Sequence, residues 1–228
     1  MNSGEQGAKA VEKGSNRRES VPPFHPARWL PGAHLQTLWG RAARPRRLVT
    51  MRREVWQTRD GDQVLLDHVD GDADRPPGSP RLLVLHGLEG SSHSVYVQGL
   101  MALAAARGWR ATTLNFRSCA RDPQRLDRMI PNRTARLYHS GDTGDLDEIA
   151  RGLRSREPGA PLLAVGVSLG GNALLKWLGE TAGERVLDAA AALSVPYDLA
   201  AGSRHMERGM GRLYQESFLK TLRSKAQH

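Results

Sequence analysis

Ser168 is the residue of this sequence whose surroundings best suit nucleophilic chemistry. It follows an apolar run and lies in Gly166-Val167-Ser168-Leu169-Gly170, which matches the G-x-S-x-G pattern of a nucleophile elbow. In such a turn a strand passes directly into a helix, the serine takes a strained backbone conformation, and the glycines let strand and helix approach closely. The pattern predicts an exposed hydroxyl at the positive end of a helix. A glycine-rich strand end would match the same residues.

A serine that attacks a carbonyl carbon needs backbone N–H groups to stabilise the negative oxygen that forms. Leu169 follows the serine directly, and we expect its N–H to be the first donor. The loop His86-Gly87-Leu88-Glu89-Gly90 follows another apolar run, and its glycines allow close approach to a ligand, so we expect the Leu88 N–H to be the second donor. We expect His86 to orient this loop. The alternative is that His86 and Gly87 merely end a strand.

The serine proton must pass to a histidine that a carboxylate holds in place. In proteins with this type of elbow, the acid and the histidine follow the serine along the chain. Only His205 and His228 follow Ser168, and Asp198 is the later acid that lies at a predicted strand end. No predicted strand delivers either histidine. The sequence therefore predicts a nucleophile without an identifiable base.

Hydrophobic patterning indicates strands that alternate with helices after an initial hairpin around Asp60-Gly61. This order predicts an α/β fold with an open, mainly parallel sheet and helices on both faces, and a ligand site at the carboxyl ends of the strands. Asn115 and Arg117 follow one of these strands and either bound that site or anchor its loops. The expected strands cover 54–58, 63–69, 81–86, 109–116, 161–167 and 186–195, the last of them buried, and the expected helices cover 94–107, 142–154, 173–178 and 200–227.

Length and composition are those of an ordinary soluble protein of 228 residues, with 39% apolar residues and a net charge of +9. Residues 1–23 are polar and are expected to form a disordered leader, and residues 24–228 to form one domain. The arginines alternate with acids along the whole chain, so we expect no nucleic acid partner, although folding could still cluster these cations. The single cysteine, Cys119, offers neither a disulfide nor a metal site, and no apolar run is long enough to span a membrane. We expect a cytoplasmic protein without metal or cofactor.

Five blocks of the sequence, which read GAHLQTL, HGLEGS, NFRSC, LYHSGDT and GVSLGGN, resemble the YheT-like branch of the α/β-hydrolase superfamily. The resemblance extends from about residue 22 to residue 223. It implies a cofactor-free serine hydrolase with esterase or lipase activity on carboxylic esters, acylglycerols included. By this resemblance Ser168 corresponds to the nucleophile, and the substrate is a small-molecule ester. The blocks cover residues 32–38, 86–91, 115–119, 137–143 and 166–172.

The sequence departs from that family in two places. Residues 120–133 differ from the family's shorter link, and the family carries its catalytic acid and histidine, with two more strands, on a further block that would begin where this chain ends. The resemblance thus implies an α/β-hydrolase domain that is C-terminally truncated relative to the family, with its last strands missing. The 186–195 strand would then have an exposed edge that invites self-association or a protein partner. The alternative to an active ester hydrolase is a non-catalytic remnant of the fold that binds a ligand or a protein.

Overall fold

The structure is a computed structural model that describes residues 23, 25–43, 49–69, 76 and 78–227. The chain divides into two compact units, residues 1–43 and residues 44–228. In the first unit, helix α1 (Ala33–Ala42) begins after Gly32, and the rings of Trp29 and Trp39 meet edge to face with centroids 5.2 Å apart. The leader expected over 1–23 lies almost entirely outside the described residues. The single domain expected over 24–228 stays a prediction.

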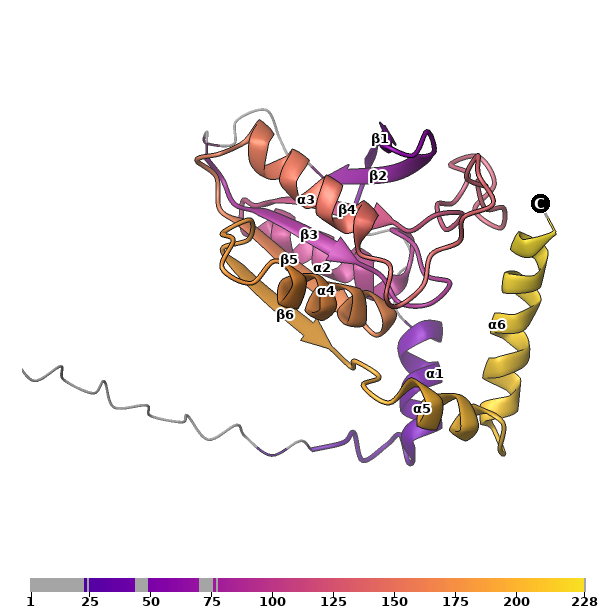
Figure 1. The fold of residues 1–228 in the computed structure, drawn as a ribbon. Coiled ribbons are helices and arrows are strands. Elements are labelled where there is room, and N and C mark those ends of the chain that lie inside the picture. The colour runs from indigo at the N-terminus through magenta and orange to yellow at the C-terminus, as the bar shows by residue number, and fades with distance from the viewer. Residues whose placement is uncertain (1–22, 24, 44–48, 70–75, 77, 228) are drawn as a thin grey trace, which may run out of the picture. The chain divides into compact units, whose positions relative to one another are not determined.

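The second unit is built on one sheet, whose described strands follow the spatial order β1-β2-β4-β3-β5-β6 (Figure 1). β1 and β2 form the expected antiparallel hairpin, β2 pairs antiparallel with β4, and β3, β4, β5 and β6 run parallel to one another. This arrangement confirms the predicted mainly parallel sheet with an N-terminal hairpin. The strands are β1 (Arg52–Gln57), β2 (Gln63–Val69), β3 (Arg81–Leu85), β4 (Arg110–Asn115), β5 (Leu162–Val167) and β6 (Ala189–Leu193).

The register of the parallel strands aligns their carboxyl ends. Leu85 at the end of β3 is opposite Leu114 of β4 and Gly166 of β5, and Val167 at the end of β5 is opposite Leu193 of β6. The loops that follow these strands therefore leave the sheet along one edge, which is where ligand sites form in such sheets.

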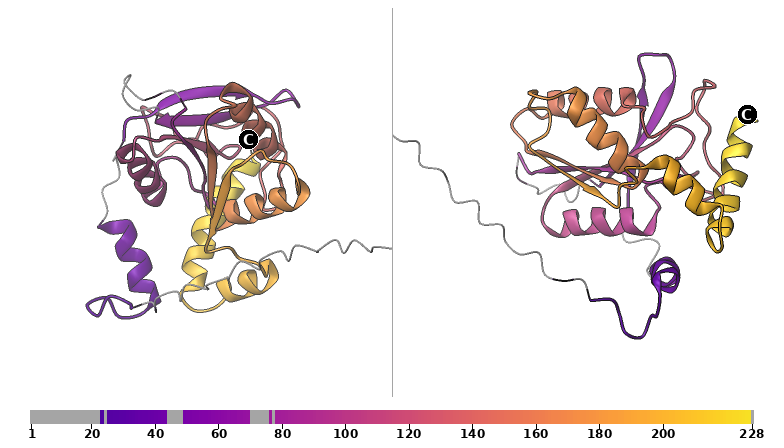
Figure 2. Two further views of the ribbon diagram at one scale, coloured as in Figure 1. Left: turned by 90° about the vertical axis from the view of Figure 1, so that its left-hand side faces the viewer. Right: turned by 60° about the horizontal axis from the view of Figure 1, so that its bottom comes forward.

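Helices cover both faces of the sheet, as the sequence predicts (Figure 2). α2 (Val95–Ala106) covers one face, and α3 (Gly144–Arg156) and α4 (Leu169–Glu180) cover the other. The period of two in a strand explains how β3 serves both faces: Leu83 and Leu85 enter the core under α3 and α4, whereas Leu82 and Val84 enter the core under α2. We call these the first core and the second core.

After β6 the chain forms α5 (Leu199–Met206) and α6 (Gly211–Ala226). No described helix has the length and apolar character needed to cross a bilayer.

The predictions for the length and burial of the last strand, β6, are wrong. The sequence predicts a buried strand over 186–195, but the strand covers only Ala189–Leu193, and most of its residues are exposed. Its apolar composition is typical of a central strand, but β6 lies at the end of the strand order and, within the described residues, pairs only with β5. An edge strand covered by α4 on one face keeps much of its surface in solvent even when it is apolar.

The close contact between the start of α4 and the end of β3 gives a stability prediction. A Cβ atom on Gly170 would lie 2.5 Å from the Leu85 carbonyl oxygen and 2.6 Å from the His86 carbonyl oxygen, and both are backbone atoms that have little freedom to move. We expect Gly170→Ala to lower the free energy of unfolding by about 2 kcal/mol or more in urea titrations. Gly179→Ala is the matched control in the same helix, since nothing lies within 4 Å of its Cβ position. That variant should be neutral or up to about 1 kcal/mol more stable. Equal stabilities of the two variants would contradict the packing described.

Candidate active site

Ser168 lies at the sharp turn between β5 and α4, where the sequence pattern places it. Its φ of 54° and ψ of −118° are a strained conformation for a residue with a side chain, and the residue is half-buried. Close packing enforces this turn, because a Cβ atom on Gly166 would lie 2.4 Å from the Gly170 carbonyl oxygen. The Ser168 N–H donates to the Leu193 carbonyl oxygen at 2.8 Å, which ties the turn to the end of β6.

The glycine loop after β3 lies directly beside the serine. A Cβ atom on Gly87 would stand 3.2 Å from Ser168 Cβ and 3.4 Å from the Val167 carbonyl oxygen. A larger residue at position 87 would therefore press against the turn, and glycine lets the backbone approach it. The glycine loop and the serine turn are therefore adjacent.

The hydrogen bonds of this loop single out one backbone donor. The Gly87 N–H donates to Tyr96 Oη at 2.8 Å, the Glu89 N–H donates to Tyr138 Oη at 2.8 Å, and the Gly90 N–H donates to the Gly87 carbonyl oxygen at 3.0 Å. The Leu88 N–H, between the two tyrosine-bound amides, donates to no group of the described residues.

Leu169 supplies the corresponding free amide on the other side of the serine. It is the first residue of α4, a position at which the N–H has no acceptor within the helix. The side chains of Leu88 and Leu169 both pack against the first core. A helix N-terminus also carries partial positive charge, which favours an anionic group placed there.

His86 is a structural part of the loop. It is fully buried, its Nδ1 lies 2.8 Å from the Gly87 carbonyl oxygen, and its Nε2 accepts the Phe116 N–H at 3.1 Å. These partners assign the single proton of a neutral imidazole to Nδ1. Burial lowers the pKa of His86 to about 4, although the hydrogen bond to Gly87 opposes that shift. With both nitrogens engaged, His86 orients the loop, as expected, and has no nitrogen left to accept a proton from Ser168.

Neither Asp198 nor His205 is hydrogen-bonded to Ser168. Within the described residues, Ser168 Oγ makes no hydrogen bond, and the candidates after it have other positions. Asp198 caps α5, where its Oδ1 accepts the Ala201 N–H at 2.8 Å, and His205 is exposed on the same helix. His228 lies outside the described residues. The serine turn thus lies beside the glycine loop, and no described residue is hydrogen-bonded to Ser168 Oγ.

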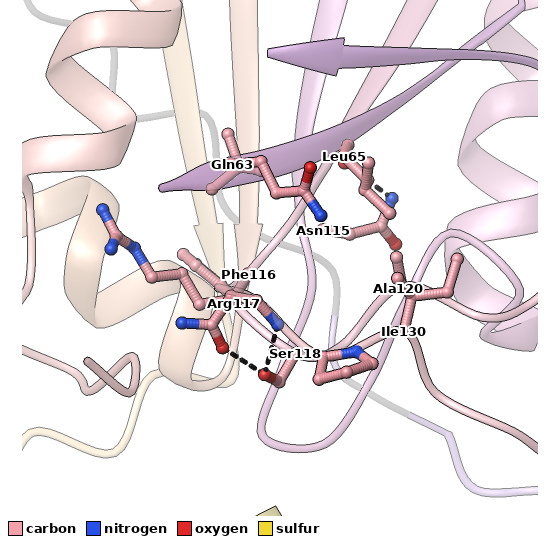
Figure 3. A pocket seen from close by; sticks show the side chains of 11 residues that line it. Gln63, Leu65, Asn115, Phe116, Arg117, Ser118, Ala120 and Ile130 are labelled. Atoms are coloured by element: carbon pink, nitrogen blue, oxygen red, sulfur yellow. Dashed lines mark hydrogen bonds between the residues drawn. The ribbon is translucent and has the colours of Figure 1, made fainter. Parts of the chain in front are cut away.

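Asn115 and Arg117 anchor loops, which decides between the two roles considered for them. The Asn115 amide donates to the Leu65 carbonyl oxygen and to Asp67 Oδ2, both at 2.9 Å. The Arg117 guanidinium is buried and binds Asp145 at 2.7 Å and Asp62 at 2.9 Å, so it joins the hairpin turn to the start of α3. A cavity of about 10 Å³ lies beside them (Figure 3), room for about one water molecule.

A larger cavity lies near α2. Its volume is about 520 Å³, and Ser168 is not among the residues that line it. Its polar wall includes the buried carboxylate of Asp67, which the Arg53 guanidinium binds through two hydrogen bonds at 2.7 and 2.8 Å. The lining residues are Val49, Thr50, Met51, Arg53, Asp67, His93, Gln98, Pro123 and Leu126.

Comparison with known proteins agrees with this geometry. The model of the alpha/beta hydrolase fold family matches residues 80–228, which span β3 to α6 and contain both the glycine loop and the serine turn. This chain belongs to the alpha/beta hydrolase fold family. The matched residues of this α/β hydrolase include the turn at Ser168 between β5 and α4.

Relatives of this α/β hydrolase carry names of ester-cleaving enzymes. It is 37% identical over 219 residues to "Putative esterase YheT" of Escherichia coli (strain K12), covering 96% of this chain and 62% of that protein. It is 32% identical over 202 residues to "Phospholipase ABHD3" of Bos taurus, covering 87% of this chain and 47% of that protein. The chain thus spans about half to three fifths of the length of these relatives.

A solved structure supports the fold. The α/β serine hydrolase without lid from Xanthomonas campestris, called XC6422, superposes with a TM-score of 0.52 over 66% of this chain and 64% of that chain. The two sequences are 18% identical, so the likeness concerns the fold alone.

Sequence reasoning missed the residues that hold the glycine loop. Tyr96, Tyr138 and Lys225 bind it through side-chain atoms. Tyr96 and Lys225 lie in predicted helices and Tyr138 lies in a predicted loop. None of these positions by itself indicates a contact with the glycine loop. The block that contains Tyr138 did stand out as a family match, which was the one available signal.

The buried, neutral His86 predicts a pH dependence of stability. In the unfolded chain the His86 imidazole has a pKa of about 6.5. In the folded chain its pKa is about 4. Because the unfolded state binds more protons between these values, stability falls as the pH is lowered through this window. We expect the protonation of His86 to lower the free energy of unfolding by on the order of 3 kcal/mol between pH 6.5 and pH 4. Urea unfolding of wild type and His86→Gln from pH 7 to pH 4 measures this, and parallel pH profiles for the two proteins would contradict it.

Proposed function

We propose that this α/β hydrolase cleaves carboxylic esters by nucleophilic acyl transfer. The Ser168 hydroxyl attacks the carbonyl carbon, and the N–H groups of Leu88 and Leu169 form the oxyanion hole. The observation that carries the proposal is the position of the glycine loop, in which Gly87 abuts Ser168 and the Leu88 N–H alone among residues 87–90 has no described partner. A donor held in place before the reaction begins stabilises the developing charge without reorganisation.

The proposed reaction proceeds in two stages. In the first, the serine oxygen bonds to the carbonyl carbon, the alcohol leaves, and an acyl-enzyme remains. In the second, water attacks the acyl group and releases the carboxylic acid and the free serine. A base at hydrogen-bond distance from Ser168 Oγ would take up the serine proton, and the described residues place none there. The described site by itself is therefore expected to react slowly.

The proposed substrate is a small-molecule carboxylic ester, acylglycerols included. Support comes from two relatives whose names are "Putative esterase YheT" and "Phospholipase ABHD3". The proposed location is the cytoplasm, because the chain has a single cysteine, Cys119, which is buried and unpaired in the structure and suits a reducing compartment.

Labelling with a fluorophosphonate probe tests the nucleophile. We expect the probe to label the wild-type chain, at a rate several powers of ten below that of a complete triad, and to leave Ser168→Ala unlabelled. Ser194→Ala is the matched control, because Ser194 has a similar positive φ of 53° but follows β6, not the strand that leads into α4. It should label like wild type. Labelling of Ser168→Ala at the wild-type rate would refute Ser168 as the nucleophile.

A second candidate function is binding of a protein or a second copy at the outer edge of β6, with or without catalysis. β6 carries no charged residue, and within the described part of the chain its outer edge is unpaired. Two apolar side chains in and just after β6 are exposed, Leu193 at 47% and Tyr197 at 81%. Unpaired strand edges with these properties accept a further strand through main-chain hydrogen bonds.

Sedimentation velocity over a range of protein concentrations tests this edge. We expect the wild-type chain to associate as the concentration rises, and Leu193→Glu to remain monomeric, because a carboxylate at the edge disfavours strand addition. Leu103→Glu is the control, since Leu103 is similarly exposed at 52% but lies on α2. Association that is equal in all three proteins, or absent from wild type, would exclude self-association at β6.

A further inference from the structure

We propose that Tyr96 and Tyr138 are positioning residues that hold the glycine loop from opposite faces of the sheet and leave the Leu88 N–H as its one free donor. The inference rests on the proposed function, because it assigns these hydroxyls to the geometry of the proposed oxyanion hole. Neither tyrosine touches the reacting atoms in this scheme.

Tyr138 fixes Glu89 through both its backbone and its side chain. The Tyr138 hydroxyl accepts the Glu89 N–H at 2.8 Å and donates its own proton to Glu89 Oε1 at 2.8 Å. Glu89 has a φ of 56°, a conformation that residues other than glycine seldom adopt without support. One hydroxyl thus stabilises the strained residue that follows Leu88.

Tyr96 fixes the residue on the other side of Leu88. Its hydroxyl accepts the Gly87 N–H at 2.8 Å and would lie 3.5 Å from a Cβ atom at position 87. With the amides of Gly87 and Glu89 both held, the peptide plane that carries the Leu88 N–H has little freedom to rotate.

The two tyrosines are anchored in different cores. The Tyr138 ring belongs to the first core and stacks on Phe116 with centroids 5.3 Å apart and planes 4° apart. Tyr96 is on α2 and packs against the second core. Because each ring is locked by its own core, the loop at the edge of the sheet takes its position from both faces.

Lys225 from α6 completes the support on the Tyr138 side. Its ammonium donates to Glu89 Oε1 at 2.7 Å and lies 5.2 Å from the centre of the Tyr138 ring, and the side chains of Lys225 and Glu89 are only 4% and 7% exposed. Burial alone would raise the pKa of Glu89, but the Lys225 ammonium and the Tyr138 hydroxyl outweigh it and hold that pKa below its usual value. Burial raises the pKa of Tyr138, so its hydroxyl keeps the proton that it donates.

Amide hydrogen exchange tests the clamp without reference to activity. In the full chain we expect the Gly87 and Glu89 amides to exchange slowly and the Leu88 amide to exchange faster. Tyr138→Phe should accelerate exchange at Glu89 by about tenfold or more and leave Gly87 unchanged, and Tyr96→Phe should do the reverse. Tyr197→Phe, which removes the same hydroxyl from an exposed ring, should change neither. If each substitution leaves its target amide unchanged, the clamp is wrong.

The rate constant of fluorophosphonate labelling tests the consequence for the site. The final labelled fraction reports how much protein is able to fold, whereas the rate constant, measured at a temperature at which each variant is fully folded, reports the geometry of the folded site. We expect Tyr138→Phe and Tyr96→Phe to reach the wild-type final fraction with a rate constant lowered roughly 10- to 100-fold, because small misplacements of a catalytic group cost rates of this order. Lys225→Arg should retain most of the rate and Lys225→Met should lose it.

The outcomes separate this inference from the proposed function. If the amides respond as expected but labelling does not depend on Ser168, the ester hydrolase proposal fails and the clamp remains as a structural feature. If labelling depends on Ser168 but both tyrosine variants keep the wild-type rate constant, the positioning role is overturned and the nucleophile remains. A lower final fraction with an unchanged rate constant would show that the tyrosines contribute only to stability.

Discussion

The close passage of α4 across the ends of β3 and β5 is the constraint on which the rest of this structure depends. At Gly166 and Gly170 backbone atoms occupy the space that a Cβ would need, so strand and helix meet with no side chain between them. This contact forces Ser168 into a left-handed conformation and brings it beside Gly87. The close contact at Gly166 and Gly170 therefore determines the direction of the serine turn and the packing of α4 on the first core. It also brings together the two loops that form the candidate site.

Backbone strain in the described chain is concentrated at the same edge of the sheet. The non-glycine residues with positive φ follow the ends of four different parallel strands, and each such conformation costs on the order of 1–3 kcal/mol. The hydrophobic cores on both faces supply the rigidity that maintains them, and the tyrosine hydroxyls transmit that rigidity to the loop after β3. Strain collected at one edge is typical of sites whose geometry is set before a ligand binds. The strained residues are Glu89, Ser118, Ser168 and Ser194.

The high arginine content serves the architecture to a large extent. Arg117 is buried among carboxylates of the hairpin turn and α3, Arg53 binds Asp67, and Arg81 and Arg110 share Glu157. Planar guanidinium groups suit such shared and bidentate contacts better than lysine ammonium groups do. These pairs fix loops and strand ends relative to one another, and within them Arg81 and Arg117 are buried.

The amino-acid sequence by itself determined the strand and helix order, the turn at Ser168 and the loop at Leu88, because each depends on apolar periodicity and glycine spacing among neighbouring residues. Only the tertiary structure decided that β6 is exposed at an edge, that Arg117 anchors a turn, and which amides of the glycine loop stay free. Those properties depend on contacts between residues far apart in the chain, such as Tyr138 with Glu89. A local pattern indicates strands, helices and turns, but burial and hydrogen-bond partners are set by which surfaces pack together, and that is settled only when the whole sheet and its helices are assembled.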